Sequence, residues 1–451
     1  MRSKEELKAA VCAAIDQQSE QIIGLGEAIM DQPELGFKEE QTARRVCESF
    51  ADLGLRYERE LALTGVKARL KGQQSGPTVA LMGELDALIV PDHPRADPAT
   101  GAAHACGHNA QIAGMVGAAY GLVAAGVSEE LAGEIAFFAV PAEEYVEIGY
   151  RLGLVEEGKI AFLGGKPELV ELGHFDDVDM AVMIHTKSSS QAEGAVGIAR
   201  SSNGFLAKNV RFIGRAAHAG GAPEKGINAL SAATLALSAI DAQRETFRDQ
   251  DCVRVHPIIT KGGDLVNIIP AEVRLETYVR ARTTEAMLDA SHKVDRALRG
   301  AAVALGCSVE IETVPGYLPL CNDPDLGELF KDNAARIFGP DQYRDYPHGG
   351  GSTDAGDLSQ IMPVLHPAMT GASGVVHGPD WGIADPAAGY LAPAKVLAMM
   401  AIDLLYSDAS TARDILQNHA PNMSKGEYLQ QQKAIFHREL FAGEQTGGNA
   451  T

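Results

Sequence analysis

Short apolar runs alternate with helical segments over the first 185 residues of this chain. Runs of five to seven residues are typical of strands that are covered on both faces. We expect such strands at 78–82, 134–140 and 180–184. We expect helices at 4–30, 40–53 and 108–125. This order predicts an α/β domain with a central mixed sheet flanked by helices.

Residues 203–314 follow a different order, β-α-β-β-α-β, which is typical of a small two-layer α+β domain. Strands are expected at 206–212, 252–261, 271–282 and 307–314, and helices at 226–243 and 284–305. The segment holds 14 Lys and Arg against 13 Asp and Glu, whereas the whole chain holds 39 against 60. A charge shift that coincides with a change of topology indicates a domain boundary on each side. We therefore predict a main domain in two parts, 1–202 and 315–451, an inserted domain at 203–314, and a flexible tail at 445–451.

The formal charge is −21 and the sequence has no block of Lys or Arg, so we do not expect this chain to bind polyanions. Nucleic acids and anionic membrane surfaces both require a basic patch. We expect no membrane-spanning helix, which would need an apolar run of roughly 20 residues. We expect no secretory signal, because the first six residues are mixed in charge. The six cysteines are scattered, as in reduced cytosolic proteins. We expect a cytoplasmic protein with a small-molecule ligand, and neither nucleic acid nor membrane as a partner.

Side chains suited to metal binding or proton transfer follow the expected strands. Asp86, the pair Glu143 and Glu144, and His185 each come directly after an apolar run. Open α/β sheets bind ligands at the carboxyl ends of their strands. Adjacent carboxylates in extended backbone point different ways, so one could bind metal while the other takes a proton from water. Each residue alone is equally explained as a turn Asp, an acidic first helical turn or a buried His, so it is their order that favours a single site.

A Cys–His pair precedes the helix expected at 108–125. Cys106 and His108 lie two residues apart in the segment HACGHN. Thiolate and imidazole are ligands for Zn²⁺ and for other transition metals, although one such pair is equally explained by a loop that leads into a helix. His377 follows the insert and is the remaining candidate. Together these residues predict a metal site at one edge of the sheet.

These motifs, in this order, resemble the aminoacylase and indole-acetyl-amino-acid hydrolase family of metal-dependent amidohydrolases. The resemblance covers nearly the whole chain. Its segments are PELGF at 33–37, Leu85-Asp86-Ala87-Leu88, HACGHN at 104–109, PAEE at 141–144, His185, Ala217-His218-Ala219-Gly220, Asn267, Pro270, STDAGD at 352–357 and His377. HACGHN, STDAGD and the segment YVRA at 278–281 especially resemble the p-aminobenzoyl-glutamate hydrolase branch.

The resemblance implies a zinc-exopeptidase-like catalytic domain and an insert that serves as a lid and forms a homodimer. It implies one or two divalent ions, Zn²⁺ or Mn²⁺. The implied metal ligands are Cys106, His108, Glu144, His185 and His377, with Asp86 orienting His108. Glu143 would be the general base. His218, supplied in relatives by the partner subunit, would stabilise the oxyanion, and Asn267 and Arg280 would contact the carboxylate end of the substrate.

Two departures from the commonest family pattern bear on the substrate. Position 109 is Asn, where many relatives have Asp, and residues 89–103 form a longer loop that begins with Ile89 in place of proline. The favoured activity is hydrolysis of a C–N bond that releases an amine or amino acid from an N-acyl or aryl-acyl amide of a small substrate with a carboxylate. The departures leave open the hydrolytic deamination of an aromatic amine, such as an anthranilate-type compound. A non-catalytic metal-binding protein is less favoured, because such a protein needs no base like Glu143 beside its metal.

Overall fold

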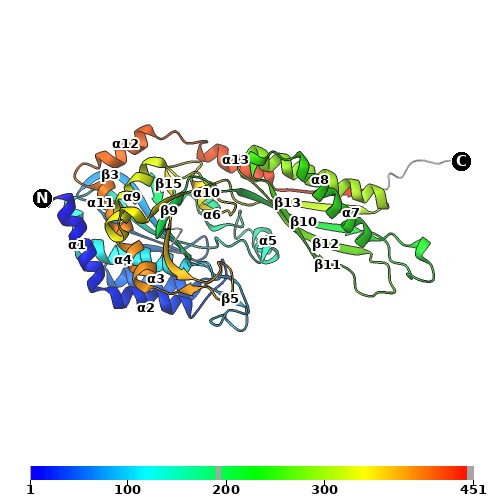
Figure 1. Ribbon diagram of the computed structural model, residues 1–451, viewed down its shortest axis with the longest axis horizontal. Helices are drawn as coiled ribbons and strands as arrows, with labels where there is room; N and C mark the ends of the chain where they lie inside the picture. Colours follow the sequence, from blue (N-terminus) through cyan, green and yellow to red (C-terminus); the bar gives the residue numbers. More distant parts are fainter. Residues whose placement is uncertain (1, 189–193, 444–451) are drawn as a thin grey trace. The chain divides into compact units, whose positions relative to one another are not determined.

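The structure, a computed structural model, describes residues 2–188 and 194–443. The predicted tail at 445–451 lies outside them. The chain forms two compact units, each with its own hydrophobic core (Figure 1). Unit 1 comprises Met1–Ser201, Cys321–His348 and Asp357–Lys425, and unit 2 comprises Ser202–Leu320, Gly349–Gly356 and Gly426–Thr451.

The main sheet of unit 1 has six strands in the order β1-β2-β6-β3-β7-β15. Its strands are β1 (Arg56–Leu61), β2 (Gly65–Lys71), β3 (Gln74–Glu84), β6 (Ala132–Val140), β7 (Met180–Val182) and β15 (Val364–Leu365). β3 pairs in parallel with both β6 and β7, and β7 with β15, whereas β1, β2 and β6 pair antiparallel. The predicted α/β fold with a central mixed sheet is therefore confirmed. A smaller sheet contains β8 (His185–Ser188), β9 (Val196–Ala199), β14 (Tyr343–Tyr346), β16 (Ala368–Ser373) and β17 (Gly382–Ile383).

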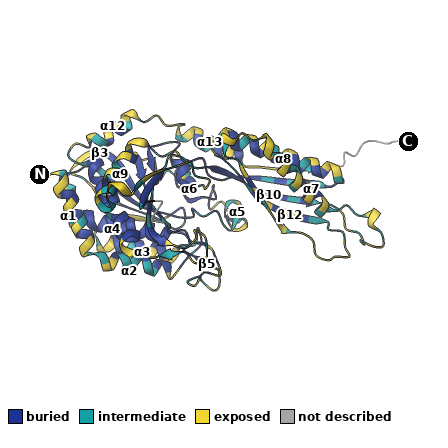
Figure 2. Ribbon diagram, viewed as in Figure 1, coloured by how far each residue is buried: buried dark blue, intermediate teal, exposed yellow. Residues whose placement is uncertain are grey.

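The helix α4 (His108–Ala124) lies at the centre of unit 1 and is buried along nearly its whole length (Figure 2). Small residues let its neighbours approach, because a Cβ added at Gly117 would lie 2.8 Å from the Cβ of Ala394. The neighbours are α1 (Lys4–Gln17), α2 (Ser19–Met30) and α11 (Ala392–Leu405). The other helices of unit 1 include α3 (Glu40–Asp52), α5 (Ile148–Glu156), α6 (Gly165–Glu171), α9 (Pro324–Phe338) and α12 (Ser410–Asn418), while the division between the units falls within α10 (Ala355–Leu358).

Two expectations about helices need correction. The helix expected over 4–30 is two helices, because the backbone leaves helical geometry at Gln18 (φ −100°, ψ 13°) while the apolar spacing continues. One apolar helical stretch, Ala387–Leu405, has 19 residues and is long and apolar enough to cross a membrane, contrary to the expectation. Of its most apolar window, 94% is buried inside the structure, as in the core helix of a globular unit.

Unit 2 has a five-stranded antiparallel sheet in the order β11-β12-β10-β13-β18. Its strands are β10 (Gly204–Ile213), β11 (Arg254–Lys261), β12 (Glu272–Ala281), β13 (Ser308–Pro315) and β18 (His437–Ala442). The helices α7 (Ala229–Ala242) and α8 (Thr284–Leu305) lie along one face of this sheet (Figure 1). The predicted order β-α-β-β-α-β is confirmed. β18, which follows α13 (Lys425–Ile435), was not expected.

Candidate metal centre

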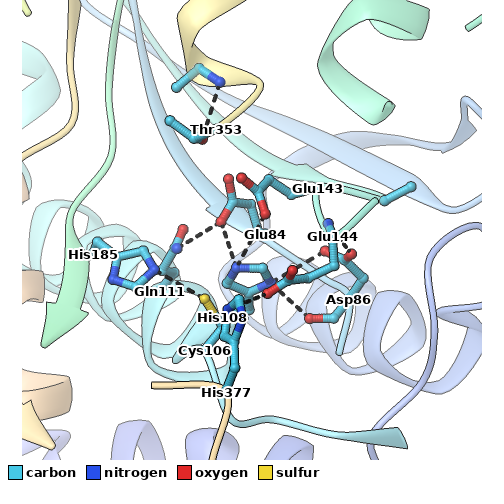
Figure 3. Close-up of polar contacts among 12 residues, drawn as sticks. Glu84, Asp86, Cys106, His108, Gln111, Glu143, Glu144, His185, Thr353 and His377 are labelled. Carbon is cyan, nitrogen blue, oxygen red and sulfur yellow. Dashed lines mark hydrogen bonds and ion pairs between the residues drawn. The ribbon is translucent and has the colours of Figure 1, made fainter. Parts of the chain in front are cut away.

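The carboxyl ends of three neighbouring parallel strands provide most of the candidate site (Figure 3). β3 ends at Glu84 and leads to Asp86, β6 leads to Glu143 and Glu144, and β7 leads to His185. Parallel strands bring their carboxyl ends to one edge of the sheet. This topology explains how residues about 100 positions apart in the sequence come together.

Cys106, His108 and His185 form the first group of possible metal ligands, with one ligand atom of each within 4.8 Å of the others. Cys106 Sγ lies 3.3 Å from His185 Nε2, and the rings of His108 and His185 meet edge to face. Gly107 between Cys106 and His108 has a φ of 103°, in the left-handed region that favours glycine. This turn lets both flanking side chains reach the same group.

Cys106 also belongs to a second group, with Glu144 and His377. His377 Nε2 lies 3.3 Å from Glu144 Oε1. Asp86 connects the two groups, because its Oδ2 accepts a hydrogen bond of 2.8 Å from the backbone N–H of Glu144, while its backbone oxygen lies 2.8 Å from His108 Nδ1. That contact turns Nε2 of His108 toward the other ligands.

The donor set fits divalent metal ions. His108 Nε2 and Glu144 Oε1 are buried and form no hydrogen bond of good geometry with any described residue. Buried polar atoms normally have such a partner, so both atoms fit positions for metal ligands. A thiol, imidazoles and a carboxylate are the ligand types of Zn²⁺, and imidazole and carboxylate also suit Mn²⁺.

Protons compete for the same ligands. Burial raises the pKa of the Cys106 thiol well above its usual range, and the Glu144 carboxylate raises it further. Burial lowers the pKa of His108, but Glu84, Cys106 and Asp86 together outweigh burial and hold that pKa well above its usual range. Metal ligands must be deprotonated, so a cation has to displace these protons and its affinity rises with pH.

Glu143 lies beside these ligand groups without belonging to either. Its Oε2 is 3.9 Å from His108 Nε2, and the residue is 8% exposed. It forms a third group with Glu84 and His108, and Figure 3 shows its carboxylate close to that of Glu84. A carboxylate next to a metal site but outside its principal ligand groups has the position of a proton acceptor.

Three buried residues behind His108 were not expected from the sequence. Glu84 Oε2 lies 3.0 Å from His108 Nε2, and Glu84 Oε1 accepts a bond of 2.6 Å from Lys166 Nζ. Gln111 Nε2 donates to Glu84 Oε2 at 2.7 Å. Burial would raise the pKa of Glu84, but Lys166 and His108 lower it well below its usual range. One signal was available, because Glu84 precedes Asp86 by two residues and alternate residues of a strand share a face.

Two of the predicted insert residues lie together in unit 2. Backbone pairing joins His218 to Ile268, the residue after Asn267. His218 Nδ1 accepts hydrogen bonds from the N–H groups of Gly220 (3.2 Å) and Gly221 (2.9 Å). These contacts put the proton of the neutral ring on Nε2, which leaves Nε2–H as the hydrogen-bond donor.

Arg280, the third insert residue, lies on β12, and its Nη1 donates a hydrogen bond of 2.8 Å to Ser352 Oγ. The structure therefore collects the predicted site residues in two places. Unit 1 holds Asp86, Cys106, His108, Glu143, Glu144, His185 and His377, and unit 2 holds His218, Asn267 and Arg280.

Comparison with known proteins finds relatives along most of the chain. The family model for peptidase family M20/M25/M40 matches residues 80–401. Xaa-Arg dipeptidase of Mus musculus is 31% identical over 428 residues, which cover 90% of each chain. N-acyl-L-amino acid amidohydrolase of Geobacillus stearothermophilus is 27% identical and covers 71% of this chain and 82% of its own.

Solved structures share the fold. One is a dinuclear metal binding peptidase from the M20 family of Bacillus subtilis, with a TM-score of 0.62 and 22% identity, covering 86% of this chain and 99% of its own. At this level of identity the likeness concerns the fold alone. The resemblance to amidohydrolases inferred from the motifs is confirmed by the family match and by the named relatives.

Proposed function

Because the chain belongs to peptidase family M20/M25/M40, a family of metal-dependent hydrolases, we propose that it cleaves a small amide with a carboxylate. It releases an amine or amino acid from an N-acyl or aryl-acyl group. The observation that carries this proposal is the position of Glu143 beside two ligand groups that share Cys106. A relative named N-acyl-L-amino acid amidohydrolase supports the class of substrate.

The proposed cofactor is a pair of divalent ions, Zn²⁺ or Mn²⁺, which would be held by the two ligand groups that include Cys106. His108 and His185 would hold one ion, and Glu144 and His377 would hold the other. When bound, such metal polarises the scissile carbonyl and makes water easier to deprotonate. Asp86 keeps His108 in the tautomer that presents Nε2 to the metal.

The side chains of this protein then divide the remaining work. Glu143 accepts a proton from the attacking water and returns it to the departing amine nitrogen. The Nε2–H of His218 donates a hydrogen bond to the oxyanion, a contact typically worth about 3–4 kcal/mol. Asn267 and Arg280 hold the carboxylate end of the substrate, since a guanidinium matches a carboxylate with two hydrogen bonds.

Deamination of an aromatic amine would use the same ligands, but neither departure from the family pattern favours it in the described residues. Asn109 is fully buried, and its side-chain amide donates to the backbone oxygen of Gly26 (3.2 Å) and to Tyr390 Oη (3.1 Å). In the loop 89–103, Arg95 pairs with Glu27 at 2.8 Å. Asn109 therefore has a role in the core, and the loop is joined to α2 by an ion pair. Release of ammonia without an amino acid would be the result that revives this alternative.

A homodimer formed through unit 2 is also part of the proposal. β11 is an edge strand of its sheet, and the loop that follows it exposes Leu265 (61%) and Val266 (103%). Exposed strand edges and apolar patches are sites of association. A cytoplasmic location is proposed from the six cysteines, none of which forms a disulfide in the described structure.

The test is Glu143→Gln, assayed on a panel of N-acyl amino acids with metal content measured in parallel. The variant keeps its metal and its fold but loses at least about 100-fold in kcat, because the proton acceptor is gone. Glu156→Gln, an exposed change on the nearby α5, is the matched control and keeps full activity. Turnover by Glu143→Gln within a few-fold of wild type would refute the role of Glu143.

A further inference from the structure

Two arginines face each other across neighbouring strands on the open face of the unit 2 sheet. In the antiparallel register Arg254 of β11 is the direct partner of Arg280 of β12. Directly opposite residues share a face, with Cβ atoms about 4.5–5.5 Å apart, and like charges in such a pair are destabilising. The pair thus costs folding free energy, which an anion bound between the guanidinium groups would offset.

This face of the sheet is hollowed rather than covered. A cavity of about 410 Å³ is lined by both arginines together with His256, Tyr278 and Glu276, among others. The buried Val255 and Val279 lie on the opposite face, in the core that includes residues of α7 and α8. The arginines therefore point away from the helices, into a space large enough for a small organic ligand.

Neighbouring groups hold Arg280 in place. Its guanidinium carbon lies 5.2 Å from the ring centre of Phe205 and 5.4 Å from that of Tyr278. Its Nη1 also donates to Ser352 Oγ. A fork fixed by two aromatic rings and a hydroxyl loses little conformational freedom when a carboxylate binds.

Arg254, by contrast, has its charge available. Within residues 2–188 and 194–443, no Asp or Glu oxygen lies within 4.0 Å of its guanidinium. The one hydrogen bond that its guanidinium donates in that part of the chain goes to the backbone oxygen of Val253, at 2.9 Å. Glu276 lies two strand positions beyond Tyr278, at the other end of the cavity, where its carboxylate repels an anion toward the arginines.

We propose that Arg254 and Arg280 form one clamp for a ligand end with two carboxylates, each guanidinium holding one of them. The inference rests on the proposed function and sharpens it: the amide substrate is a conjugate of a dicarboxylic amino acid rather than of a neutral one. Arg280 holds the first carboxylate, and Arg254 determines the preference for a second.

The test compares two isosteric substrates, an N-acyl-L-glutamate and the corresponding N-acyl-L-glutamine, on the metal-loaded enzyme. Wild type prefers the glutamate conjugate in kcat/KM. Arg254→Gln lowers kcat/KM for the glutamate conjugate by about tenfold or more, through KM, because a hydrogen bond between charged groups is lost. The same variant leaves kcat/KM for the glutamine conjugate within about twofold.

The matched control is Arg274→Gln, on the same strand and face as Arg280, where the guanidinium is already paired with Glu272 at 2.9 Å. Arg274→Gln changes kcat/KM for neither conjugate. Arg254→Lys, which keeps the charge but loses the fork, falls between wild type and Arg254→Gln. Equal losses on both substrates in Arg254→Gln, or no preference in wild type, would overturn the clamp while leaving the proposed hydrolase intact.

A binding measurement separates the two proposals if neither conjugate is hydrolysed. Calorimetric titration of the metal-loaded protein with glutarate, a simple dicarboxylate, detects binding that Arg254→Gln weakens at least fivefold and Arg274→Gln does not. That result without any turnover would contradict the proposed amide substrates but keep the clamp. Hydrolysis of the conjugates, with glutarate binding that does not depend on Arg254, would contradict the clamp but keep the proposed amide substrates.

Discussion

A single residue, Glu84, shows how this site keeps charge inside a core. Both Glu84 and Lys166 are at most 1% exposed, and their charged atoms lie 2.6 Å apart. Moving two charges out of water is costly, and their attraction offsets that cost only when both are present and hydrogen-bonded. Lys166 thus keeps Glu84 ionised next to His108, where it favours the position of the imidazole.

We predict that Lys166→Met lowers the free energy of unfolding by about 3–5 kcal/mol, because it leaves the Glu84 carboxylate buried and uncompensated. Urea unfolding measures the change. Glu84→Leu combined with Lys166→Met recovers most of the loss, and Lys159→Met, an exposed change, has no effect beyond about 0.5 kcal/mol. A cost below 1 kcal/mol for Lys166→Met alone would show that the pair does not compensate the buried charge.

Part of the site could be predicted at this scale and part could not. Cys106, His108 and Glu143 stand in short motifs with a recognisable chemistry, so the sequence predicts them. Lys166 has no such neighbour, because it lies on α6 and meets Glu84 only through the tertiary fold. A lysine with no local pattern is normally assigned to the surface, so pairing across 82 positions is invisible in the sequence.

At the scale of elements, the apolar pattern of the sequence predicts a helix or strand correctly where that element buries a regular face. α8 spans 284–305 as predicted, because its apolar residues repeat on one side over 22 residues. β18 was missed, because its residues are mostly polar or partly exposed and it is stabilised by pairing with β13 far earlier in the chain. The break between α1 and α2 was missed because the apolar spacing continues through it without interruption.

The close packing around α4 gives a prediction for this element. Gly117→Ala destabilises the protein by about 1–3 kcal/mol, because the new Cβ would overlap Ala394 on α11. Gly153→Ala on α5 is the control, since nothing lies within 4 Å of its added Cβ. There the substitution stabilises by up to about 1 kcal/mol through helix propensity. Equal urea midpoints for the two variants would contradict tight packing at α4.

The whole molecule divides its charge unevenly. The segment 203–314 is nearly neutral, while the formal charge of the chain is −21. An acidic surface favours solubility and disfavours polyanions, yet the paired arginines of unit 2 create a local site for a small anion. Net charge therefore argues against polyanionic partners without deciding the charge of a small substrate.

Association of two chains gives a prediction at this scale. Val266→Lys places a charge on the most exposed apolar residue next to β11, so sedimentation velocity should shift from dimer to monomer. Val303→Lys, an equally drastic change at an exposed position of α8, keeps the wild-type state. A wild-type protein that sediments as a monomer would contradict the proposed dimer directly.

The proposed metal centre, with two ligand groups that both include Cys106, is tested by counting metal ions per chain. Elemental analysis should find two in wild type, one in His377→Ala and close to none in Cys106→Ser, which also loses hydrolase activity. Cys321→Ser, at an exposed cysteine, retains both ions. Two ions and full activity in folded Cys106→Ser would show that Cys106 is not a metal ligand.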